Sequence, residues 1–227
     1  MWTRSGPAAL LLTTGCNCNP GFGAFAGHCA VFGGALATNG DLCPQPACRT
    51  ENPATEECGC PPGFILSGRM NLLDTSSCPG NNPPYGWEAM YFCHVPSLPA
   101  GAEFGGVYER DENDACAVAN SFTGGCGCPA GFNAVEMPVA GSCWYWRKVG
   151  VCYNAAATRT TFHGTYLQSD YSGYGSGGCV TGNPLNGGAC ACPPDTRDIP
   201  IRSVLGPDNS CNSNGQYGAF VHVCMGY

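Results

Sequence analysis

One acidic run in this chain could bind a metal ion. Residues 109–114, ERDEND, precede Cys116 and carry four carboxylates and one side-chain amide. Oxygen ligands at alternating positions can hold calcium, so calcium is the one cofactor that the sequence allows. A solvated acidic turn explains the same residues without a ligand, and we favour that interpretation.

No set of residues has the spacing of an enzyme site. Residues 173–178, GYGSGG, match a glycine motif for phosphate binding, but that motif needs a strand before it and a helix after it. Neither is indicated, so we interpret the run as a loop. The four histidines are scattered and none has a zinc-type spacing. A cysteine nucleophile is not expected where nearly every thiol should be bonded, and we predict that the chain is not an enzyme.

Two tryptophans could contact a ligand. Trp144 and Trp146 follow Cys143 and flank a tyrosine. On a strand the two rings would share one face, and exposed aromatic rings stack on sugars or on a protein partner. Core packing, a protein interface and glycan binding all stay open for this pair.

The cysteine content indicates the compartment. The chain has 19 cysteines among 227 residues, and only 11% of its residues are charged. This is the composition of a disulfide scaffold, which persists in oxidising surroundings. A zinc protein would carry C-x2-C pairs and partner histidines, whereas the pairs here are C-x-C. We therefore predict a secreted, extracellular protein.

Charge and hydropathy exclude other partners. The net charge is −7, and the nine basic residues form no cluster, so a nucleic-acid partner is not expected. No apolar run reaches the length of a transmembrane segment. The apolar part of residues 1–16 is shorter than that of a signal peptide. We interpret this segment as part of the mature chain, with any export signal already missing.

The cysteines belong to a repeat. Each unit opens with an aromatic-glycine strand start, followed by a cysteine and, four residues later, an asparagine. A C-x-C pair with a Pro-Gly turn comes next, then a cysteine in a variable loop and a fifth cysteine in an alternating apolar run. We expect a partial repeat at 1–31 and complete repeats at 32–103, 104–161 and 162–227. In order, the complete repeats contain Cys48, Cys58, Cys60, Cys78 and Cys93; Cys116, Cys126, Cys128, Cys143 and Cys152; and Cys179, Cys190, Cys192, Cys211 and Cys224. The partial repeat contains Cys16, Cys18 and Cys29, and Cys43 is an extra cysteine.

These features predict a mainly β, small disulfide-rich fold. Short alternating runs and frequent turn residues indicate tandem modules of short antiparallel strands with long loops and little helix. Each module is too small to bury much apolar surface, so we expect disulfides to take the place of a large core. Neighbouring side chains of an extended C-x-C segment point to opposite faces. One pair can therefore link its strand to a neighbour on each side.

The partial repeat suggests one disulfide pattern. If Cys29 occupies the fifth position, this repeat lacks the first and fourth cysteines together. Their joint loss suggests that these two bond each other, although Cys29 could instead occupy the fourth position. The pairs would then be Cys48–Cys78, Cys116–Cys143 and Cys179–Cys211.

A second pattern comes from a family resemblance. Residues 16–22, CNCNPGF, followed by Cys29 resemble the end of an EGF-like module, and six cysteines between Cys29 and Cys78 resemble its cysteine order. The resemblance implies the pairs Cys29–Cys48, Cys43–Cys58 and Cys60–Cys78. These conflict with the first pattern, and the residues alone leave both open.

Two features predict assembly. An odd number of cysteines leaves at least one without an intrachain partner, which suggests a bond to another subunit. The partial first repeat should have an incomplete sheet edge, which is a template for another strand. Head-to-tail contacts of this kind give open filaments. We therefore expect a structural protein that binds copies of itself in a filament or surface layer; the alternative is a monomeric, lectin-like adhesion module that binds glycans.

Overall fold

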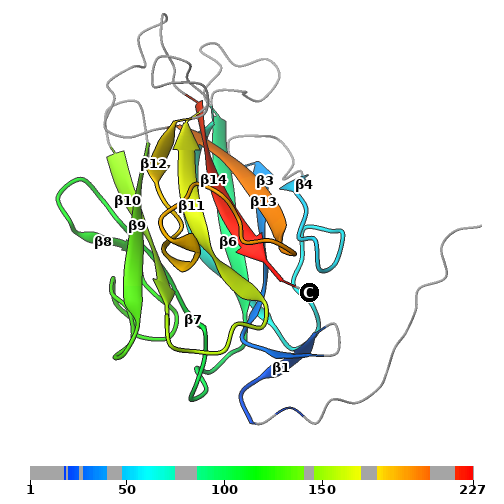
Figure 1. Ribbon diagram of the computed structural model, residues 1–227. Helices are drawn as coiled ribbons and strands as arrows, with labels where there is room; N and C mark the ends of the chain where they lie inside the picture. The colour runs from blue at the N-terminus through cyan, green and yellow to red at the C-terminus, as the bar shows by residue number, and fades with distance from the viewer. Residues whose placement is uncertain are drawn as a thin grey trace, which may run out of the picture.

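The regular secondary structure of the described residues is almost entirely antiparallel strand. The computed structural model describes residues 18, 20–25, 28–39, 48–74, 86–140, 146–169, 178–204 and 218–226 (Figure 1). Among them the only helical element is a short 3-10 turn, Pro184–Asn186. This confirms the predicted fold class, a mainly β, disulfide-rich chain of repeated small sheets.

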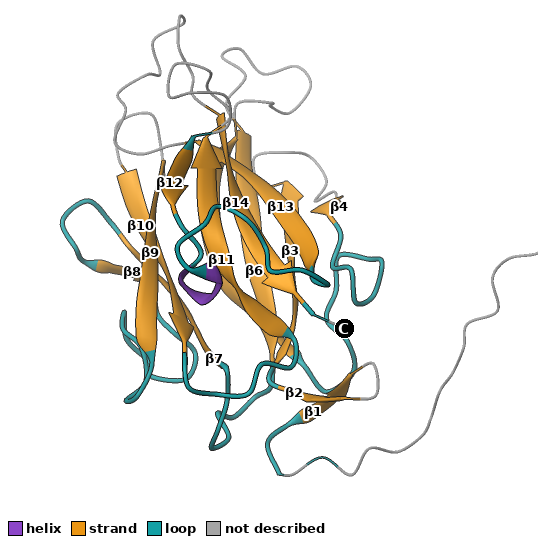
Figure 2. Cartoon of the chain, in the orientation of Figure 1, coloured by secondary structure: helices purple, strands orange, loops and turns teal. Residues whose placement is uncertain are grey.

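Three four-stranded sheets have the same strand order (Figure 2). In each, the first and fourth strands pair at the centre, while the short second strand and the long third strand form the edges. The first sheet contains β4 (Cys48–Thr50), β3 (Phe32–Asn39), β6 (Gly86–His94) and β5 (Ile65–Asp74). The second contains β8 (Cys116–Val118), β7 (Phe104–Arg110), β10 (Trp146–Tyr153) and β9 (Asn133–Ala140). The third contains β12 (Cys179–Thr181), β11 (Phe162–Ser169), β14 (Gly218–Met225) and β13 (Arg197–Val204).

The three sheets close into a ring. The third strand of each sheet contacts the first two strands of the next: β5 contacts β7 and β8, β9 contacts β11 and β12, and β13 contacts β3 and β4. Thr165 Oγ1 lies 3.6 Å from Met137 Sδ at one such contact. Thr50 Oγ1 donates to the Pro200 carbonyl at 3.4 Å where the third sheet meets the first. The repeats are therefore parts of one closed unit.

The inner faces of the sheets share one apolar core. Phe32, Phe104 and Phe162, one from each first strand, are fully buried with ring centroids 5.1 to 5.3 Å apart. Buried methionines and aliphatic side chains of all three sheets continue this core. The expectation that disulfides replace a large core is therefore wrong. Closing three small sheets around one axis buries the apolar face that a single module would leave exposed.

The C-x-C pairs link two different strands, as their geometry predicts. The first cysteine of each pair bonds the cysteine of the second strand, and the second bonds that of the fourth strand. The bonds are Cys48–Cys58, Cys116–Cys126 and Cys179–Cys190, and then Cys60–Cys93, Cys128–Cys152 and Cys192–Cys224.

Both disulfide patterns inferred from the sequence are wrong. Cys48 bonds Cys58 instead of Cys78, and Cys60 bonds Cys93, so neither the joint-loss pairs nor the pairs implied by the EGF-like order form. The reason is strand order: the C-x-C segment lies between the second and fourth strands and reaches both. Five cysteines lie outside the described residues: Cys16, Cys43, Cys78, Cys143 and Cys211.

A buried asparagine joins the parts of each repeat. Asn52, Asn120 and Asn183 are fully buried. The Asn120 amide nitrogen donates to the carbonyls of Gly105 and Gly127 at 2.9 and 3.2 Å and lies 3.5 Å from Cys152 Sγ. Its Oδ1 accepts from the Phe122 N–H at 2.9 Å. The side chain thus connects the first strand, the C-x-C segment and the fourth strand.

A glycine in the first strand makes room for each asparagine. Gly106 has φ +88°, and a Cβ at this position would collide with Asn120 Oδ1. Gly34 and Gly164 have the same conformation against Asn52 and Asn183. The glycine and the asparagine of the repeat pattern are therefore one structural device.

Candidate functional site

The N-terminal hairpin is half of a repeat. It consists of β1 (Gly23–Phe25) and β2 (His28–Ala30), and the Cys18–Cys29 disulfide joins β2 to the segment before β1. Ala24 pairs with Cys29 in the register that places Ala134 opposite Cys152 in the second sheet. Cys29 therefore occupies the fifth position of the pattern, and β1 and β2 correspond to the third and fourth strands of a complete sheet.

Among the described residues, β2 has no counterpart of the first strand and asparagine turn that cover the fourth strand of each complete repeat. In the sheets, each fourth strand pairs on both sides, whereas among the described strands β2 pairs only with β1. Cys93, Cys152 and Cys224 are fully buried, and an asparagine amide approaches each sulfur at 3.4 to 3.5 Å. Cys29 is partly exposed. This greater exposure of Cys29 is expected if no first strand and no asparagine turn pack on the Cys18–Cys29 disulfide.

The hairpin packs on the first repeat through glycines. A Cβ on Gly23 would lie 2.6 Å from the Phe64 ring, so the ring lies directly against the β1 backbone. Gly21, at φ +96°, packs against Pro99. Just beyond β2, the Val95 N–H donates to the Val31 carbonyl at 3.0 Å. These contacts fix the hairpin beside the ring (Figure 2).

The sheets of the ring protect their own edges. Their second strands are only three residues long. Two of the third strands contain a proline, Pro138 in β9 and Pro200 in β13, and the third strands also lie against the next sheet. Short edge strands and edge prolines prevent pairing with another chain. Among the described strands, β2 has none of these protections except its shortness.

The outer faces of two sheets carry a second candidate site, a tyrosine bonded to a carboxylate. Tyr108 donates to Glu136 Oε1 at 2.8 Å, and burial together with Glu136 raises the pKa of Tyr108 to about 12. Tyr166, at the same position of the third repeat, donates to Asp198 Oδ2 at 3.2 Å. Burial and the Asp198 charge also raise the pKa of Tyr166. Both hydroxyls stay protonated and act as hydrogen-bond donors.

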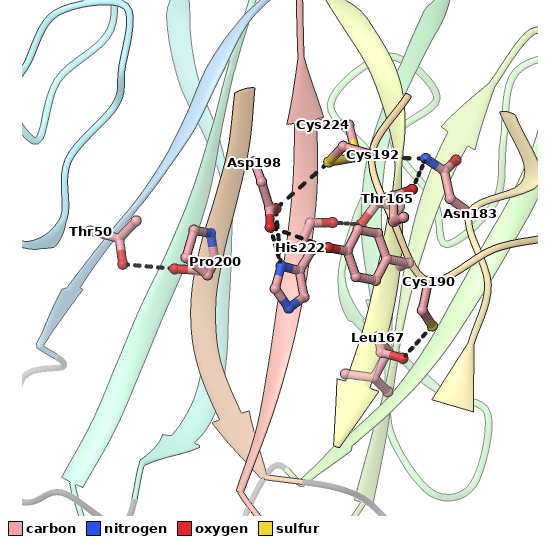
Figure 3. A network of polar contacts seen from close by, with 12 residues as sticks. Thr50, Thr165, Leu167, Asn183, Cys190, Cys192, Asp198, Pro200, His222 and Cys224 are labelled. Atoms are coloured by element: carbon pink, nitrogen blue, oxygen red, sulfur yellow. Dashed lines mark hydrogen bonds and ion pairs between the residues drawn. A yellow bond between two sulfur atoms is a disulfide. The ribbon is translucent and has the colours of Figure 1, made fainter. Parts of the chain in front are cut away.

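A histidine distinguishes the third sheet from the second. His222 Nδ1 lies 2.9 Å from both oxygens of Asp198, and its ring stacks on Tyr166 with centroids 4.3 Å apart (Figure 3). Gly150 takes the place of His222 in the second sheet, where the Tyr108 ring covers the backbone. The Asp198–His222 pair is an oriented imidazole of the kind used in acid–base chemistry. His222 Nδ1 and the Tyr166 hydroxyl both bond the Asp198 carboxylate, so these polar atoms have their partners within the cluster.

The acidic run does not form one centre. Glu109 is fully buried and bonds Arg147 at 2.9 Å, whereas Asp114 lies at the surface and bonds Lys148 at 2.7 Å. Asp111 Oδ1 accepts from two backbone N–H groups of its own turn. Among the described residues no group of three or more histidine, cysteine or acidic side chains is placed to hold a metal ion. The run is therefore divided between an ion pair inside the second sheet and a capped turn.

The tryptophan pair is only partly described. Trp146 begins β10 opposite Ala140, while Trp144 and residues 173–177 of the glycine motif lie outside the described residues. The interface and glycan interpretations of the two tryptophans stay predictions. Sequence reasoning missed the Tyr166–Asp198–His222 cluster. A tyrosine four residues after the first-strand phenylalanine, in the second and third repeats, was the available signal.

Comparison with protein-family models and with curated proteins identified no relative of this chain. No protein-family model matches the chain, and no curated protein is significantly similar to it. The described residues contain no helix long and apolar enough to cross a membrane. The chain therefore resembles EGF-like modules only in being a cysteine-rich repeat. Its disulfide pairs and its sheet topology are the features that characterise its fold.

Proposed function

We propose that this protein is a secreted, extracellular structural protein whose subunits associate end to end through the N-terminal half-repeat. The observation that carries the proposal is the β2 edge: among the strands that the structure describes, β2 pairs with one strand, whereas its counterparts in the ring pair with two. An extended segment added to that edge would gain backbone hydrogen bonds. A contact between unlike surfaces of successive subunits would propagate into a filament or surface layer.

The cysteine pattern supports a covalent contribution. Cys16 holds the position of Cys126 in the repeat, whose partner is the second-strand cysteine Cys116. The second-strand cysteines of all three complete repeats are bonded within their own repeats. These three cysteines are therefore not the partner of Cys16, and we propose that its partner is a cysteine of a neighbouring subunit. Disulfide bonding of this kind also fits an oxidising, extracellular location.

Removing the half-repeat should abolish the assembly. The test uses electron microscopy and sedimentation of the oxidised full chain, of a variant starting at Phe32, and of Cys16→Ser. We expect end-to-end oligomers of the full chain, monomers of the shortened variant, and loss of the reducible gel ladder in Cys16→Ser. The shortened variant keeps all three sheets, so circular dichroism provides the control for folding.

Two results would contradict the proposal. One is a full chain that stays monomeric at high concentration with or without reductant. The other is an assembly that survives removal of residues 1–31. A monomer that binds glycans and loses that binding in Trp146→Ala would instead support the lectin-like alternative.

A further inference from the structure

The junction between the first and second sheets contains a buried histidine. His94, at the end of β6, has no exposed surface. Its Nδ1 lies 2.6 Å from the Val95 carbonyl oxygen, and its Nε2 lies 2.8 Å from Ser121 Oγ in the asparagine turn of the second repeat. The Phe122 ring packs on the imidazole with centroids 4.5 Å apart. His94 therefore connects one repeat directly to the next.

The two contacts show which ring nitrogen carries the hydrogen in the neutral form of His94. A carbonyl oxygen only accepts, so Nδ1 must carry the hydrogen in this geometry. In neutral histidine Nε2 is then an acceptor, and the Ser121 hydroxyl donates to it. Protonation of Nε2 would force this hydroxyl to turn and would place a positive charge inside the junction. Burial is the main reason why the pKa of His94 lies below its ordinary value of 6.5.

Within the described part of the chain, no charged group contributes to the pKa shift of His94. The neighbours that face it are Phe104 from β7 and Ser121 and Phe122 from the turn, while Phe32 of β3 and Ile65 of β5 pair with its backbone. None of these side chains titrates near neutral pH. Glu103 is adjacent to Phe104 in the sequence, but its carboxylate accepts a hydrogen bond from Thr160 Oγ1 at 2.8 Å and not from His94.

The other ring junctions are built differently. Thr160 Oγ1 donates to Glu103 Oε1 and joins the segment before β11 to the segment before β7. Thr161 Oγ1, next to β11, donates to the Phe32 carbonyl of β3. His163 lies close to these residues, and burial also lowers its pKa. A backbone hydrogen bond to Thr160 and the Glu103 charge oppose that shift of the His163 pKa, while the Arg159 charge adds to it. His163 is also partly exposed, whereas His94 is fully buried.

We infer that the buried His94 ring makes the first-to-second junction the acid-sensitive point of the ring. The inference is independent of the assembly proposed above. The unfolded or opened chain binds a proton more readily than the closed ring, so acid favours opening. The effect begins as the pH falls through 6.5, the ordinary value for histidine, and ends below the lowered pKa of the closed state. Above pH 6.5 the junction keeps its full stability.

The full chain and three variants test this inference. Amide exchange of the turn that contains Ser121, corrected for its intrinsic pH dependence, is compared with that of the equivalent turn in the third repeat, Pro184–Asn186. We expect opening at the Ser121 turn to increase by up to about tenfold for each pH unit below 6.5. The increase should disappear in His94→Gln and persist in His163→Gln. In Ser121→Ala the increase should remain, because the charge and not the hydroxyl is its cause.

An NMR titration of the His94 ring keeps the inference testable if His94→Gln does not fold. The ring should titrate below pH 6.5, with Nδ1 carrying the hydrogen in the neutral form. Titration at or above 6.5 would overturn the inference. An acid-induced opening of the same size in His94→Gln, or an equal opening of the third-repeat turn, would overturn it as well.

Discussion

Asn120→Ala should lower the free energy of unfolding by about 3 kcal/mol, because a buried group left without its hydrogen-bond partner costs about 1 to 3 kcal/mol. The truncation leaves two backbone carbonyls, of Gly105 and Gly127, without their amide donor, and the Phe122 N–H without its acceptor. Asn120 and its bond to the Gly105 carbonyl are fully buried, so water reaches that carbonyl only if the repeat opens. Denaturant unfolding of the oxidised protein measures the loss.

A second asparagine in the same repeat provides the control. Asn113 is exposed, and Asn113→Ala should change the stability by less than about 0.5 kcal/mol. Similar losses for the two variants would show that Asn120 does not link the strands as the geometry indicates. Because Asn52 and Asn183 make the same contacts, their alanine variants should repeat the effect of Asn120→Ala in the other two repeats.

The repeat pattern contained this device before the structure explained it. An asparagine four residues after the first cysteine recurs in each complete repeat, as does the glycine two residues after the strand-start aromatic. Recurrence alone did not indicate that the two residues touch. Contact requires the positive φ of Gly106 and the path of the C-x-C segment back to the first strand, and both are tertiary features.

Disulfide pairing was the least predictable part. The C-x-C geometry predicted correctly that each pair links two different neighbours. Which cysteines they reach depends on strand order, and the centre of each sheet is formed by the first and fourth strands. The first cysteine of each complete repeat bonds the first cysteine of the C-x-C pair, so its loss says nothing about the fourth cysteine. The joint-loss argument failed for this reason.

The candidate site was predictable only in outline. The partial repeat indicated an incomplete sheet edge, and within the described part of the chain β2 pairs on one side only. The recurring tyrosine was the one signal for the Tyr166–Asp198–His222 cluster, and nothing in the residue pattern indicated the His94–Ser121 contact. Each joins residues from strands or turns that are distant in sequence. The size of the core was underestimated for the same reason. Each repeat was considered alone, whereas its apolar face is buried by the other two.

The shared core leads to a prediction about cooperativity. Phe104→Ala should destabilise the protein by about 4 kcal/mol, within the range for removing a fully buried phenylalanine. The Phe104 ring lies 5.1 Å from those of both Phe32 and Phe162, so the cavity opens at the point where all three sheets meet. We therefore expect the whole ring to unfold in one transition at a lower temperature. Calorimetry of the oxidised protein tests this through equality of the calorimetric and van't Hoff enthalpies.

A variant at the exposed Leu66 is the control that separates the loss of core packing from a general loss of apolar surface. This side chain is 50% exposed at the start of β5, and Leu66→Ala should shift the transition little. Independent modules would behave differently: Phe104→Ala would then lower only one of several transitions, the one that belongs to the second repeat. A split transition of that kind would contradict the closed ring, since a ring that shares its three central phenylalanines cannot lose one repeat and keep the inner faces of the other two buried.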